Sequence, residues 1–145
     1  MRLILVLIAV SFFTVNCISQ NQVKWTFSYD SDLNGFKASA EINEGWHLYS
    51  QHIDNEIGPV PTSFNFEENS MITLVGSTKE PESLKEYDEN FEGELNFFKE
   101  NATFKQKMKV STSTSVKGVI TYMTCNDTMC LPPKDVEFVI TINKL

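Results

Sequence analysis

The chain has 145 residues, with 12 Lys and Arg against 19 Asp and Glu, which gives a formal net charge of −7. An acidic chain has little with which to neutralise phosphates, so the composition argues against a nucleic-acid-binding protein. No basic cluster or amphipathic helical stretch indicates a membrane-surface protein either. The length is that of one domain.

The first residues, 1–19, have the layout of a secretory signal peptide. Arg2 precedes an apolar run at 3–13, and small residues follow it. The run is shorter than the roughly 20 apolar residues of a membrane span. We therefore expect cleavage after Ser19 and export from the cytoplasm, with no membrane span once the signal is removed.

Cleavage would leave one domain, 20–145, of 145 − 19 = 126 residues. Without Arg2, 11 basic and 19 acidic residues remain, a net charge near 11 − 19 = −8. A lipid anchor on Cys17 is the alternative to simple cleavage, but Asn16 is a poor residue immediately before a lipidated cysteine.

Apolar and polar residues then alternate with a period of two, which is typical of β-strands. The alternation occurs, in chain order, in KWTFSYD (24–30), FKASAEI (36–42), TSFNFE (62–67), ATFKQKMKV (102–110), VKGVITYMT (116–124) and DVEFVITIN (135–143). Turn signals separate these runs at 31–35, 43–45, 57–61 and 112–115. The patterns predict about eight or nine short strands and an all-β sandwich.

The stretch 76–94 is the most acidic and the least strand-like part of the chain. It predicts a long solvated connection, in which 83–90 would hold one helical turn at most. Long connections in compact domains are often functional.

Two cysteines, Cys125 and Cys130, lie near the mouth of a predicted turn at 126–129. An even number of cysteines in an exported domain favours a disulfide. The bond would close a loop of about six residues and would stabilise the fold by about 2 kcal/mol, less than a bridge between distant strands. The spacing therefore leaves a redox-active and a structural disulfide both open.

A metal site is the third hypothesis for the cysteine pair. Met123 and Met129 add soft sulfur donors, which suit Cu(I). A zinc site is not favoured, because no second cysteine pair completes four ligands. His47 and His52 are five residues apart, so on one strand they would face opposite sides and form no chelate. Each is expected to be an ordinary surface or half-buried histidine.

Four stretches carry a family resemblance: GWHLYSQ (45–51), PVPTSFNF (59–66), YDENFEGE (87–94) and GVITYMTCNDTMCLPPKDVEF (118–138). They resemble, in the right order, the N-terminal periplasmic domain of the thiol:disulfide interchange protein DsbD. The last stretch is the most specific, with a strand, Tyr122, the two cysteines around a short loop, and then an apolar residue and two prolines.

The resemblance implies an immunoglobulin-like β-sandwich with the cysteine pair at a hairpin near one end. It also implies a component of a protein-disulfide reductase that uses no cofactor and works by thiol–disulfide exchange. Cys130 would form the mixed disulfide with a partner, and Cys125 would resolve it.

The resemblance further implies an aromatic cap that shields the pair until a partner docks. Phe91 matches the cap. Asp88 and Glu89 would lie beside it, and the surrounding shell would contain Tyr49, His47 and Tyr122. Nearby carboxylates disfavour a thiolate and would keep the reduced cysteines protonated.

The implied partners are a thioredoxin-like domain of a DsbD-type membrane reductase, as electron donor, and oxidised periplasmic proteins such as disulfide isomerases or the cytochrome c maturation machinery. Two features depart from the family. The family pattern has one more residue between its cysteines than the four here. The chain also ends at Leu145, directly after the last predicted strand, so we expect a free-standing domain that needs separate partners.

Overall fold

The computed structural model describes residues 21–53, 56 and 58–144, and this part of the chain contains strands but no helix. Accordingly, none of these residues belongs to a helix that could cross a membrane. The expected signal peptide at 1–19 and the possible lipid site at Cys17 lie outside the described residues and stay predictions.

The described strands form three antiparallel sheets. The first contains, in order, β1 (Val23–Asp30), β2 (Gly35–Ile42), β8 (Asn101–Val110) and β5 (Ile72–Lys79). The second contains β11 (Lys134–Ile142), β9 (Thr114–Tyr122) and β4 (Ser63–Phe66). The third contains β10 (Thr124–Cys125), β3 (His47–Tyr49), β7 (Gly93–Phe98) and β6 (Leu84–Asp88).

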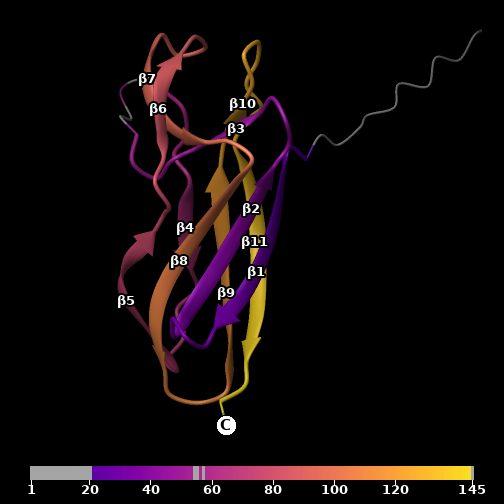
Figure 1. Cartoon of the computed structure of the whole chain (residues 1–145). Coiled ribbons are helices and arrows are strands. Elements are labelled where there is room, and N and C mark those ends of the chain that lie inside the picture. The colour runs from indigo at the N-terminus through magenta and orange to yellow at the C-terminus, as the bar shows by residue number, and fades with distance from the viewer. Residues whose placement is uncertain (1–20, 54–55, 57, 145) are drawn as a thin grey trace, which may run out of the picture.

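The first two sheets pack face to face, and the third continues the sandwich at the end opposite the C-terminus (Figure 1). The predicted all-β sandwich is confirmed, with the cysteine pair at a hairpin near that end. The turns expected at 31–35 and 43–45 are also confirmed.

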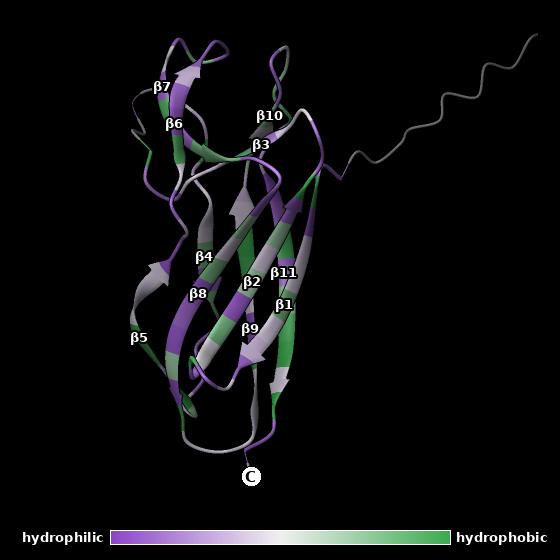
Figure 2. Ribbon diagram, viewed as in Figure 1, coloured by the Kyte–Doolittle hydropathy of each residue, from purple (hydrophilic) through white to green (hydrophobic). Residues whose placement is uncertain are grey.

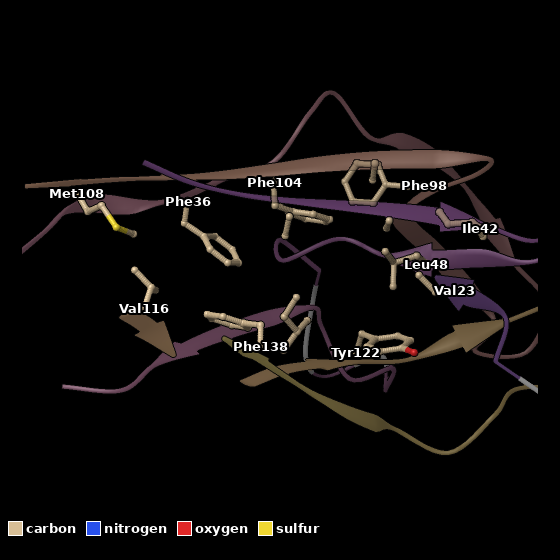
Figure 3. Close-up of a cluster of buried hydrophobic side chains, with 14 of the residues drawn as sticks. Val23, Phe36, Ile42, Leu48, Phe98, Phe104, Met108, Val116, Tyr122 and Phe138 are labelled. Carbon is tan, nitrogen blue, oxygen red and sulfur yellow. The ribbon is translucent and has the colours of Figure 1, made fainter. Parts of the chain in front are cut away.

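The core lies between the first two sheets, because strands such as β2, β8 and β9 turn alternate apolar side chains inward. Figure 2 shows hydrophobic and hydrophilic residues interspersed along β2. Phe36 of β2 and Phe138 of β11 come from opposite sheets, and their ring centroids are 4.6 Å apart. Figure 3 shows Phe104 on the side of Phe36, and Tyr122 on the side of Phe138. The core extends into the third sheet through Phe98 of β7, whose ring centroid lies 5.6 Å from that of Phe104.

The prediction of a long solvated connection at 76–94 is wrong, because this stretch contains strands. β5 continues to Lys79, β6 occupies Leu84–Asp88, and β7 begins at Gly93. No helical turn forms at 83–90. β6 is an edge strand whose first four residues are exposed, so it pairs with β7 through its backbone and needs no apolar alternation.

Candidate functional site

The two cysteines form a disulfide across the mouth of a hairpin at the end of the sandwich. Cys125 ends β10 and is paired with His47 of β3, and Cys130 faces it in an isolated antiparallel bridge. The turn between them, residues 126–129, is here called the cysteine turn. Its ends are joined by the Asn126 N–H, which donates to the Met129 carbonyl at 2.9 Å.

The two sulfur-bearing residues differ in exposure. Cys125 has no exposed surface and belongs to a small apolar cluster with Tyr49, Leu95 and Phe97. Cys130 is half-buried at the edge of the same cluster. An incoming thiolate therefore reaches Cys130 more readily than Cys125.

The turn at residues 89–92, between β6 and β7, is here called the cap turn, and it contains Phe91, the expected cap residue. Phe91 packs on the cluster that contains Cys125, together with Cys130. Its ring stands nearly perpendicular to that of Tyr49, with centroids 5.9 Å apart and an interplanar angle of 83°. Phe91 therefore lies on the cluster that contains Cys125, and its role as a cap stays a prediction.

Gly58 forms another wall of the Phe91 site. Its φ of +119° is a conformation that side-chain-bearing residues rarely adopt. A Cβ at this position would lie only 2.9 Å from Cδ1 of Phe91. Glycine is therefore needed both for the local backbone and for the seat of the ring.

Beneath the cap, Asp88 joins a buried polar network. Tyr49 donates its hydroxyl to Oδ2 of Asp88 at 2.6 Å, and Nε2 of His47 lies 3.2 Å from the same oxygen. The backbone N–H of Asn90 donates to Oδ1 at 2.8 Å. Asp88 therefore fixes the start of the cap turn to β3, the strand that pairs with Cys125.

The network shifts the pKa values of its members. Burial opposes the charge on Asp88, but the hydrogen bonds from Tyr49 and the Asn90 backbone, with His47 beside it, outweigh burial and lower the pKa of Asp88 below its ordinary value. Burial lowers the pKa of His47 although Asp88 opposes that shift. Burial and the bond to Asp88 raise the pKa of Tyr49. At neutral pH the network holds a carboxylate, a neutral imidazole and a phenol.

The structure brings together most of the residues that the sequence singled out. Phe91, Asp88, Tyr49 and His47 all lie around the cysteine pair, and His47 is buried. Glu89 is exposed in the cap turn. The side chain of Tyr122 belongs instead to the main core, where burial raises its pKa.

Other residues of the site were not predicted from the sequence. Leu95 and Phe97 alternate inward on β7, and that alternation in GELNFF could have identified them. No comparable pattern identifies Gly58 or Asn90, whose importance depends on contacts between distant segments.

Sequence, fold and site together define a β-sandwich domain that carries a disulfide hairpin under an aromatic cap. The family described as "Thiol:disulfide interchange protein DsbD, N-terminal" matches residues 14–141. The chain therefore belongs to the family of DsbD N-terminal domains, which are thiol–disulfide interchange modules. No curated protein matches the chain.

Solved structures of similar fold include the DsbD N-terminal domain of Neisseria meningitidis in the reduced form. It is 18% identical with a TM-score of 0.64, and the match covers 85% of this chain and 87% of that one. Another is a complex between the DsbD N-terminal and PilB N-terminal domains from Neisseria meningitidis. Its matching chain is 17% identical with a TM-score of 0.63, with 86% and 90% covered.

Proposed function

We propose that this protein is a periplasmic carrier of reducing equivalents that works by thiol–disulfide exchange at Cys125 and Cys130. The observation that carries the proposal is the disulfide at the tip of the sandwich, in which Cys125 is fully buried and Cys130 is partly exposed. A bond that only stabilised the fold would need neither this asymmetry nor an aromatic cap.

In the reduction of the carrier, a partner thiolate attacks Sγ of Cys130. A new bond forms between the two proteins, the Cys125–Cys130 bond breaks, and the electron pair leaves on Cys125, which takes up a proton. A second thiol of the partner then attacks the mixed disulfide and releases Cys130. Two electrons have passed to the carrier, and the partner is left with a disulfide.

In the reduction of a client the same steps run in reverse. The Cys130 thiolate attacks the client disulfide, and Cys125 resolves the resulting mixed disulfide. Because Tyr49 packs beside Cys125 and donates to Asp88, the carboxylate lies one side chain away from the buried sulfur. Its negative charge disfavours a second anion there, which keeps the reduced pair protonated between partners.

The proposed electron donor is a thioredoxin-like domain of a DsbD-type membrane reductase, and the acceptors are oxidised periplasmic disulfide-handling proteins. The similar Neisseria domain, solved in complex with the PilB N-terminal domain, supports a partner that docks on this kind of fold. Docking would move Phe91 aside, in the manner of a lid.

The first test is the reduction potential of the Cys125–Cys130 pair, equilibrated against a thioredoxin couple. We expect a value between about −270 and −180 mV, the range of exchange proteins. A Cys125→Ser variant should then trap a mixed disulfide through Cys130, whereas Cys130→Ser should not. A potential well below about −300 mV, with no trapping, would identify a structural disulfide and an interaction module instead.

A further inference from the structure

The cap turn and the cysteine turn, which belong to different hairpins, are joined by a hydrogen bond. The side-chain amide of Asn90 donates to the backbone carbonyl of Asn126 at 3.0 Å. Asn126 directly follows Cys125, and Asn90 directly precedes Phe91. The bond therefore links the residue beside the cap ring to the residue beside the buried sulfur.

Asn90, the donor, is held in place by its own backbone. Its N–H donates to Oδ1 of Asp88 at 2.8 Å, and the other oxygen of that carboxylate accepts from Tyr49 at 2.6 Å. Asp88 is only 4% exposed. The side chain of Asn90 thus extends from a backbone that is anchored to β3.

The acceptor is equally constrained, because the cysteine turn is closed by several bonds of its own. Oδ1 of Asn126 accepts from the N–H groups of Thr128 at 2.9 Å and Met129 at 2.8 Å. The Asn126 N–H donates back to the Met129 carbonyl at 2.9 Å. The Asn126 carbonyl is therefore presented outward from a rigid turn, toward the cap.

The backbone of Asn90 and the cysteine turn are already held in place, so forming the hydrogen bond between them costs little conformational entropy. Even at the surface, this bond can therefore stabilise the closed position of the cap turn. We propose that Asn90 is a positioning residue that latches the cap turn onto the cysteine turn and so keeps the Phe91 ring packed on the cluster that contains Cys125. The inference rests on the proposed function and deepens it, because the latch decides how often the disulfide is open without a partner. A partner that docks on the cysteine turn would compete for the same carbonyl.

The test measures how fast dithiothreitol, in large excess, reduces the disulfide of the intact protein. Wild type reacts only when the cap is open, and removing one hydrogen bond of ordinary strength should raise the open fraction about fivefold. We therefore expect Asn90→Ala, and equally Asn90→Ser, to react about fivefold faster. Asn65→Ala, a change at an exposed residue of β4, should react like wild type.

A double-mutant comparison separates the latch from a general loosening of the fold. Phe91→Ala alone should react faster than wild type, and adding Asn90→Ala to it should give no further acceleration, because the latch acts only through the ring. The free energy of unfolding of Asn90→Ala should fall by about 1 kcal/mol, which is the fivefold change converted at 1.4 kcal/mol per tenfold, because the unfolded chain also lacks the bond; a much larger fall would indicate a general loosening. Unchanged kinetics in Asn90→Ala, or the same acceleration with and without Phe91, would overturn the proposal.

This experiment uses a small reductant and no protein partner. Its outcome therefore does not depend on the reduction potential or on trapping. Failure of the latch would leave a carrier whose cap is held by Phe91 and by the bond from the Asn90 backbone to Asp88. A potential in the structural range would reject the carrier while the kinetics still reported how the cap opens.

Discussion

His47 has an unusual setting for a histidine that faces a carboxylate. The ring is 7% exposed and packs on Phe97 with centroids 4.6 Å apart, so burial lowers its pKa even though Nε2 lies beside Asp88. Lys99 opposes the protonated form as well, and Asp127 favours it. The neutral imidazole is therefore the form that fits the folded site.

This setting predicts a loss of stability in mild acid. In the unfolded chain the histidine pKa is about 6.5, and in the folded protein it is lower, so the unfolded chain binds more protons between the two values. The free energy of unfolding should then fall as the pH drops below about 6.5, by at most about 1.4 kcal/mol per pH unit for one proton.

Urea unfolding of His47→Gln between pH 7.5 and 5.5 checks this expectation, because the variant should lose most of the pH dependence in that window. His52→Gln is the matched control, since His52 is the other histidine of the chain and is exposed. A wild-type slope retained in His47→Gln and lost in His52→Gln would reverse the assignment.

The third sheet is attached to the first sheet by the connection that follows the edge strand β5. Glu80 accepts from the Ser50 hydroxyl at 2.5 Å through Oε1 and from the Gln51 N–H at 2.8 Å through Oε2. Ser50 directly follows Tyr49 and has no exposed surface. The carboxylate therefore ties the end of β3, beneath the cap, to the first sheet.

We expect Glu80→Ala to lower the free energy of unfolding by about 2 kcal/mol, because a buried hydroxyl and a backbone N–H lose a charged acceptor. Urea denaturation measures the change, with Glu82→Ala, at an exposed position of the same connection, as the control. Equal effects of the two substitutions would show that Glu80 does not connect the sheets.

The same elements explain how far the sequence predicts the structure. β2, β8 and β11 face the core, so the apolar alternation that their burial requires is visible in their residues. β6 lies at an edge, and its acidic, exposed sequence resembles a loop because backbone pairing leaves no trace in composition. The long core strands were predicted, whereas the edge strand β6 and the short strands β3 and β7, which also place Leu48 and Phe98 in the core, were not.

The residues of the candidate site also divide into those that the sequence predicts and those that it does not. The cysteine hairpin is local in sequence, and its turn at 126–129 could be located from the spacing alone. Gly58 and Phe91 are far apart in the chain, as are Asn90 and Asn126, and their contacts exist only after the sheets assemble. Residue types and spacing do not predict contacts between segments that are far apart in the sequence. A family resemblance could nevertheless indicate the cap residue.

For the whole molecule, folding and the disulfide are linked by a thermodynamic cycle. The bond joins residues five apart, so it closes a short loop and should stabilise the folded protein by about 2 kcal/mol relative to the dithiol form. By the same cycle, folding stabilises the disulfide against reduction by an equal free energy. The potential of the folded protein should therefore lie about 40 mV below that of its own unfolded chain.

Two independent measurements check the cycle. Urea unfolding of the oxidised and reduced protein gives the stability difference, and equilibration against a thiol buffer, with and without denaturant, gives the difference in potential. The double variant Cys125→Ser with Cys130→Ser should match the stability of the reduced protein. If both differences are much larger than about 2 kcal/mol and about 40 mV, loop closure alone does not account for them, and reduction changes the folded state around the pair. The cap turn, whose Phe91 packs on the cluster that contains Cys125, is the part of the molecule where such a change would begin.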